Sequence, residues 1–133
     1  METINEKIAD LAGKNLPYMG QWEISQVPEP VFGLQTKYGS IPLLNLVVHR
    51  ESYFIFNTYI ALPGEPNSAA KTLIEAIEQH KVIPETLLVR EKTIIKELEP
   101  IASTFEFQIV YPSRFKAVPS VLREMRKFFR NPR

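Results

Sequence analysis

The stretch VIPETLLVREKTIIKELEPI, residues 82–101, joins a short apolar strand to a helix through a charged triplet at residues 90–92. Its second half repeats apolar residues at helical spacing, which predicts a helix over residues 93–104 that Pro100 must kink or split. The apolar strand FEFQIVYP, residues 105–112, follows this helix. Strands joined by a crossover helix pair in parallel through a right-handed connection, so the stretch predicts the parallel part of a sheet.

Three strand candidates precede this unit: VFGLQT at 31–36, PLLNLVVHR at 42–50 and YFIFNTYIAL at 53–62. The linkers between them, KYGS and RES, are so short that only hairpins fit, which predicts a three-strand antiparallel meander. Both faces of the third candidate carry large apolar residues, so helices are expected on both sides of the sheet.

Apolar residues at helical spacing predict three more helices, over residues 4–12, 68–80 and 118–131. Between the first helix and the first strand candidate, residues 15–30 contain three prolines and a glycine. We interpret this segment as a connecting arm with at most a brief strand at 22–25, because proline and glycine interrupt regular structure.

These elements predict an α+β (mixed α/β) fold in the order βββαβαβα. Its five-stranded mixed sheet combines the three-strand antiparallel meander with two parallel strands and carries helices on both faces. We expect a single domain over residues 1–133, with an N-terminal helix and arm at 1–30 and an α/β core at 31–133.

Composition excludes several classes of function. The chain has 133 residues, 44% of them hydrophobic and 23% charged, which is typical of a globular domain. Because it contains no cysteine, disulfides, thiolate metal sites and cysteine nucleophiles are excluded. No apolar run approaches the roughly 20 residues of a membrane helix, and no export signal is visible, so we expect a cytoplasmic protein without a membrane span.

Charge is concentrated at the C-terminal end. Residues 1–113 hold 9 Lys and Arg against 14 Asp and Glu, a net charge of −5, whereas residues 114–133 hold 7 Lys and Arg against one Glu, a net charge of +6. The candidates for binding an anion or a nucleic acid are Arg114, Lys116, Arg123, Arg126, Lys127 and Arg130. Three alternatives remain for this basic helix: a solvated face, a surface for a protein partner or homodimer mate, and a surface for nucleic acid or a membrane.

The predicted order is similar to the ribonuclease H-like fold, in which a three-strand meander is extended by two parallel strands. Enzymes of that fold hold divalent metals with carboxylates from the first strand, the first crossover helix and the end of the fourth strand. Here the helix offers Glu75 or Glu78 and the strand end offers Glu91, but the candidate first strand VFGLQT contains no acid. The resemblance therefore implies this topology without the catalytic carboxylates.

The stretch PETLLVREKTIIKELEPIASTFEFQIVYPSRFKAVPSVLREM, residues 84–125, resembles the C-terminal part of an uncharacterised bacterial domain of unknown function. Its pattern is Pro-Glu, a strand, a charged turn, a helix with leucine and proline, a further strand and a last helix. This resemblance to the C-terminal third of the chain implies a fold but no activity, cofactor or catalytic residue.

No other motif indicates catalysis. The only histidines, His49 and His80, lack the local spacing of a zinc site, and no serine lies in a nucleophile motif. We therefore expect no cofactor, no metal and no enzymatic activity, and predict a binding or assembly module for protein–protein interaction with Tyr18, Trp22 and Phe129 as contact residues. The alternatives are a nucleic-acid-binding protein that uses the basic helix and, third, a divalent-metal hydrolase built on Glu75, Glu78 and Glu91.

Overall fold

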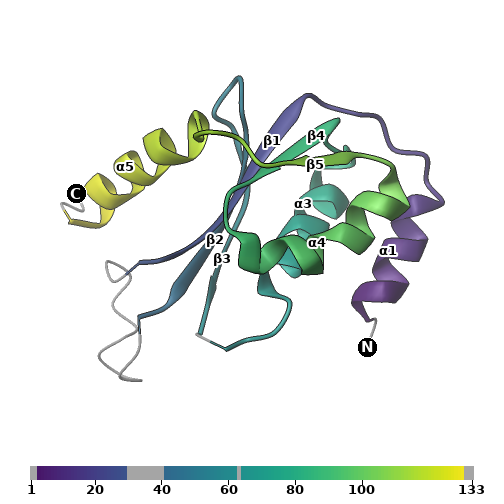
Figure 1. Cartoon of the computed structure of the whole chain (residues 1–133), viewed down its shortest axis with the longest axis horizontal. Coiled ribbons are helices and arrows are strands. Elements are labelled where there is room, and N and C mark those ends of the chain that lie inside the picture. Colours follow the sequence, from purple (N-terminus) through teal and green to yellow (C-terminus); the bar gives the residue numbers. More distant parts are fainter. Residues whose placement is uncertain (1–2, 30–40, 63, 131–133) are drawn as a thin grey trace.

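A computed structural model describes residues 3–29, 41–62 and 64–130, and these residues contain the four predicted helices around one sheet (Figure 1). The elements, in chain order, are α1 (Ile4–Ala12), β1 (Gln21–Pro28), β2 (Leu43–His49), β3 (Ile55–Ala61), α3 (Ser68–His80), β4 (Thr86–Val89), α4 (Lys92–Phe105), β5 (Gln108–Val110) and α5 (Ala117–Arg130).

The five strands form a mixed sheet in the order β3-β2-β1-β4-β5. The first three strands make an antiparallel meander, since β1 pairs with β2 and β2 pairs with β3 in opposite directions. On the other side of β1, β4 and β5 are parallel to it and to each other. The predicted fold class, an α+β fold with a mixed sheet of three antiparallel and two parallel strands, is confirmed.

The first strand of the meander lies earlier in the chain than we predicted. Residues 21–28, which we interpreted as part of a connecting arm, form β1, the central strand of the sheet. Along this strand, Trp22 and Ile24 face one side of the sheet and Glu23 and Ser25 face the other, and all four side chains are buried. The strand ends at Pro28, which cannot donate a backbone hydrogen bond. The predicted strand at 31–36 lies outside the described residues.

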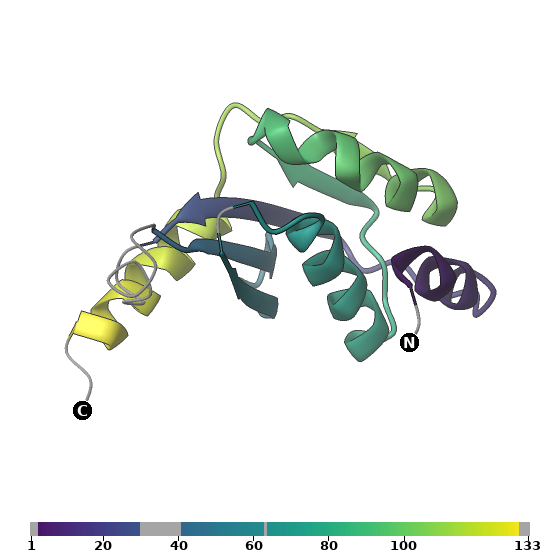
Figure 2. The same ribbon diagram turned by 90° about the horizontal axis from the view of Figure 1, so that it is seen from below.

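Helices cover both faces, as predicted, and divide the core in two (Figures 1 and 2). On one face, buried side chains of α1, α3 and α4 pack with those of β1, β2, β3 and β4. On the other face, α5 packs its apolar stripe against Leu44, Leu46 and Val48 of β2 and is the one helix of the described residues that does so. Figure 2 shows α5 far from α1, so the first and last helices lie at opposite ends of the molecule.

Three helices differ in the capping bonds at their start or in a proline within them. Thr3 and Glu6 form a capping box at the start of α1, as their spacing predicts. Pro100 lies inside α4, which continues unbroken from Lys92 to Phe105, so the helix is not split. At the start of α3, Asn67 makes no side-chain cap, and Glu97 of α4 accepts a hydrogen bond from the Ala70 N–H at 3.0 Å instead.

Candidate binding sites

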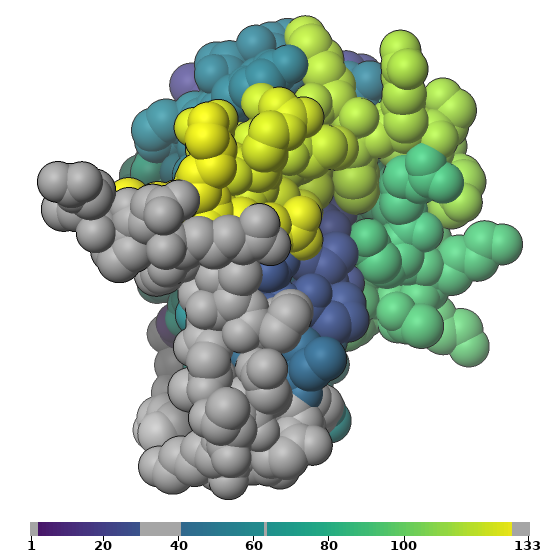
Figure 3. Space-filling model, turned by 90° about the vertical axis from the view of Figure 1, so that its left-hand side faces the viewer, coloured from purple at the N-terminus to yellow at the C-terminus, as the bar shows by residue number. Residues whose placement is uncertain are grey.

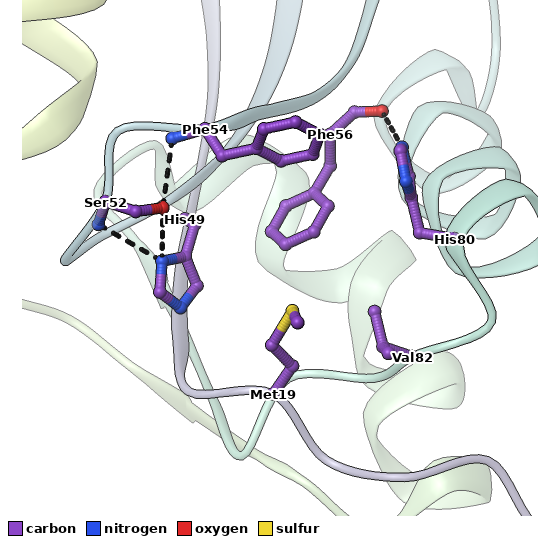
Figure 4. A pocket seen from close by; sticks show the side chains of 7 residues that line it. All are labelled: Met19, His49, Ser52, Phe54, Phe56, His80 and Val82. Carbon is purple, nitrogen blue, oxygen red and sulfur yellow. Dashed lines mark hydrogen bonds between the residues drawn. The ribbon is translucent and has the colours of Figure 1, made fainter.

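An apolar pocket of about 470 Å³ lies where β2 turns into β3 (Figure 4). Its lining residues come from three separate segments of the chain and are Met19, His49, Ser52, Phe54, Phe56, His80 and Val82. The volume and the mostly apolar lining, with a few polar groups, are typical of sites that bind a ligand or a partner's side chain.

Aromatic rings form one wall of this pocket. Phe56 stacks on the buried Trp22 with 4.1 Å between ring centroids, which holds it rigidly against the core. Phe54 meets Phe56 edge to face at 5.2 Å, and the His80 ring meets Phe54 in the same way at 5.4 Å. Phe54 is 51% exposed and Met19 is 47% exposed, so two large apolar side chains of the wall remain open to solvent.

Hydrogen bonds indicate the role of one ring nitrogen in each imidazole. His80 Nε2 lies 2.9 Å from the backbone oxygen of Phe56, and since a carbonyl can only accept, Nε2 donates. His49 Nδ1 accepts from the backbone N–H of Ser52 at 3.1 Å, so that nitrogen carries no proton. Both rings are therefore held in place by the backbone, as Figure 4 shows.

His49, Glu51 and Ser52 have the chemical composition of a catalytic triad. Ser52 Oγ lies 2.8 Å from His49 Nδ1, within the distance of a nucleophile and its base, and Glu51 lies 3.5 Å from His49 Nε2. However, all three residues belong to one hairpin turn, and Ser52 Oγ also accepts from the Phe54 N–H at 3.3 Å. These bonds close the turn, which accounts for the contact. The sequence analysis missed this cluster, whose only local signal is the His-x-x-Ser spacing.

The charged triplet at residues 90–92 connects elements of the fold. Arg90 donates to the backbone oxygen of Ser113 and lies over the Tyr111 ring, with 5.4 Å to the centroid. Glu91 accepts hydrogen bonds from Ser25 Oγ at 3.1 Å and from the Gln26 N–H at 3.4 Å. Burial raises the pKa of the Glu91 carboxyl, and these two hydrogen bonds partly oppose that shift.

The acids of the predicted hydrolase site do not form a cluster. Glu75 lies 3.5 Å from the side-chain amide of Asn57, while Glu78 pairs with Lys7 and Glu91 meets β1. Among the described residues, no three His, Cys, Asp or Glu side chains are placed to hold a metal ion. The observed first strand does contain an acid, Glu23, but its carboxylate binds Arg50 and the first turn of α5.

The six basic candidates of the C-terminal segment separate into groups. Arg126 forms a close ion pair with the buried Glu29, at 2.6 Å, and Lys127 lies 3.8 Å from Glu124. Arg114, Lys116 and Arg123 instead line a hollow of about 560 Å³ together with Arg50 and Tyr53. The side chain of Arg130 lies outside the described part of the structure.

The three predicted contact residues also differ. Trp22 is fully buried and donates through Nε1 to the Met19 oxygen at 2.8 Å, so the prediction that it contacts a partner is wrong: β1 carries it into the core. Tyr18 is exposed, but its hydroxyl donates to the backbone oxygen of Glu106 at 3.0 Å. Phe129 has a side chain outside the described part.

The elements form a small α+β fold built on one mixed sheet, with the apolar pocket and the basic hollow on different faces. The chain belongs to the family described as Domain of unknown function (DUF6930), whose model matches residues 8–126. The match runs from α1 into α5. It therefore extends well beyond the C-terminal third of the chain, whose sequence pattern resembles a domain of unknown function. No curated protein matches the chain. None of the helices in the described residues is long and apolar enough to cross a membrane.

Proposed function

We propose that this domain is a non-catalytic binding module that accepts an apolar side chain of a protein partner in the pocket beside Met19 and Phe54. The observation that carries the proposal is the pocket itself, with two large apolar wall residues about half exposed. Exposed aromatic and Met side chains around a preformed pocket are typical of the anchor points of protein interfaces.

The edge strand next to the pocket favours a protein partner over a small molecule. β3 ends the sheet, and within the described residues no other strand pairs with its outer side. Phe54 comes directly before β3, whose Ile55 and Ile60 are 40% and 39% exposed. An extended segment can add to such an edge through backbone hydrogen bonds while a side chain enters an adjacent pocket.

The ribonuclease H-like topology is also part of this proposal. Its support is the strand order β3-β2-β1-β4-β5, with β1, β4 and β5 parallel. Where an enzyme of that fold has carboxylates from the first and fourth strands, Glu91 after β4 meets the hydroxyl of Ser25 in β1, and the carboxylate of Glu23 in β1 is bound to Arg50 and α5. The remaining carboxylate and hydroxyl are a weak ligand set for a divalent cation, which favours a binding role over metal-dependent hydrolysis.

Peptide selection tests the binding role. Short random peptides displayed on phage are selected on the wild-type protein, and the enriched peptides are titrated against variants. We expect a large apolar residue in each enriched peptide, and affinity that falls at least about tenfold in Phe54→Ala and in Met19→Ala. Tyr111→Ala is the matched control, because it removes an exposed aromatic ring at the far edge of the sheet. Peptides that bind Phe54→Ala as tightly as wild type would contradict the proposal.

The non-catalytic part needs its own test, because Ser52 and His49 are in contact. The protein is treated with an alkyl fluorophosphonate, which labels activated serines, and its mass is measured. We expect no labelling of Ser52, because the turn holds its hydroxyl and the His49 Nδ1 in bonds to the backbone. Labelling at Ser52 that disappears in His49→Ala would identify an active nucleophile and overturn this part of the proposal.

A further inference from the structure

The second hollow lies on the other face of the sheet, between the β2–β3 hairpin and the start of α5. Arg50 and Tyr53 of the hairpin form one side, and Arg114, Lys116, Ser120 and Arg123 form the other. In Figure 3, the blue-green hairpin and the yellow-green segment that leads into α5 lie side by side on this face. Four cationic side chains therefore line one hollow, and no acid is among its described lining residues.

Most of this positive charge has no counter-charge among the described residues. Arg50 pairs with the buried Glu23 at 2.7 Å, and Glu23 uses its oxygens on Arg50 and on three backbone N–H groups. Within the described residues, no ion pair joins Arg114, Lys116 or Arg123 to an acid. These three cations face a hollow without a counter-charge, which favours occupation by an anion.

The donors in the hollow match a phosphate group. Guanidinium groups bind phosphate oxygens through paired hydrogen bonds, and a lysine adds a compact charge. Tyr53 is 39% exposed, and Lys116 lies 5.9 Å from its ring centroid. An aromatic ring beside a phosphate site is a surface on which a nucleobase can stack.

We propose that this hollow binds the phosphate of a nucleotide, free or within a single strand, with Arg114, Lys116 and Arg123 on the phosphate and Tyr53 against the base. A free nucleotide and a nucleotide within a single strand present the same phosphate and base. The site is separate from the apolar pocket, which lies on the face that carries α3, so either proposal can fail without the other.

Fluorescence anisotropy tests the site with two probes, a labelled single-stranded oligonucleotide and a labelled adenosine triphosphate, each at low and at moderate salt. We expect binding that weakens with salt and falls at least about tenfold in the double variant Arg114→Glu, Arg123→Glu. The control double variant Lys96→Glu, Lys127→Glu changes the net charge equally but lies outside the hollow. It should retain most of the affinity.

The probes separate the two sources. Binding of the triphosphate with an affinity close to that of the oligonucleotide indicates a free nucleotide, and binding of the oligonucleotide alone indicates a strand. Tyr53→Ala should weaken both probes while leaving competition by inorganic pyrophosphate unchanged, because pyrophosphate has no base. Each variant changes only exposed residues and should melt like wild type, so a loss of affinity reports on binding. Equal losses of affinity in the two double variants, or no binding of either probe at low salt, would overturn the proposal.

Discussion

The carboxylate of Glu23 accepts a hydrogen bond from the backbone N–H of Val118 at 2.8 Å, although 95 residues separate them in the chain. It also accepts from the N–H groups of Ala117 at 2.9 Å and Lys116 at 2.8 Å. The first N–H groups of a helix have no partner within the helix, and a negative charge there is favourable. A buried acid of the central strand thus caps α5 and attaches it to the sheet.

Replacing Glu23 with alanine should destabilise the protein strongly. The change leaves three N–H groups and the Arg50 guanidinium without their acceptor, and breaking such a buried pair costs about 3–5 kcal/mol. The free energy of unfolding, measured with urea, should fall by that amount. Glu99→Ala, which removes an exposed acid from α4, is the control and should change it little. A Glu23→Ala protein within about 1 kcal/mol of wild type would contradict the capping role.

The sequence predicted the elements whose signals are local. The hairpin of β2 and β3 and the helices α1, α3 and α4 follow from periodicity, caps and short linkers over neighbouring residues. β1 was predicted as at most a brief strand at 22–25 because Gly20, Pro28 and Pro30 interrupt the segment. A strand buried on both faces also accepts Glu23 and Ser25 only when distant residues satisfy them. A partner 95 residues away leaves no trace in the local pattern.

Glu97 of α4 should support the start of α3 in a similar but weaker way. Its Oε2 accepts from the Ala70 N–H at 3.0 Å, whereas Asn67, at the N-cap position, makes no side-chain bond. We expect Glu97→Ala to lower the free energy of unfolding by about 1 kcal/mol, the usual cost of losing a helix cap. Amide hydrogen exchange of α3 should be faster in the variant. Unchanged exchange at Ala70 would show that the bond does not protect this turn.

The candidate sites were less predictable than the fold. The sequence analysis tested His49 and His80 as metal ligands, and Ser52 had only the His-x-x-Ser spacing as a signal. Met19 and Phe54 had none, because the pocket gathers residues from separate parts of the chain. The sequence identified the basic residues, but it did not show which of them pair with acids and which line the hollow. Arg126 is paired with Glu29, whereas Arg123, three residues earlier, faces the hollow with Arg50 of the hairpin.

Glu91 should make stability depend on pH. Burial raises the pKa of its carboxyl above the ordinary value of 4.5, so the folded state binds the proton more tightly than the unfolded state does. Stability from this group is therefore highest below pH 4.5 and falls as the pH rises from there through the raised folded value. Glu91→Gln carries no charge, and its amide can still accept from the Gln26 N–H and donate to Ser25 Oγ.

The free energy of unfolding of Glu91→Gln, measured with urea across this pH range, should thus rise relative to wild type as the pH increases and then level off. Glu99→Gln, in which an exposed carboxylate of α4 is neutralised, should follow the wild-type profile closely. A difference between Glu91→Gln and wild type that stays constant with pH would show that burial does not disfavour the Glu91 charge.

Gly20 should be essential for the shape of the apolar pocket. Its φ of +61° is unfavourable for other residues, and a Cβ there would lie 2.7 Å from His49 Nε2 and 3.1 Å from Glu51 Oε1. Gly20→Ala should therefore cost about 1–3 kcal/mol and displace the His49 ring from the pocket wall. Gly64→Ala is the matched control, since Gly64 also has a positive φ, +89°, but a Cβ there would meet nothing within 4 Å. The imidazole signals of His49 in NMR spectra should shift in Gly20→Ala and stay unchanged in Gly64→Ala. The selected peptides should also bind more weakly to Gly20→Ala. Equal effects of the two variants would show that the close contact with His49 is unimportant.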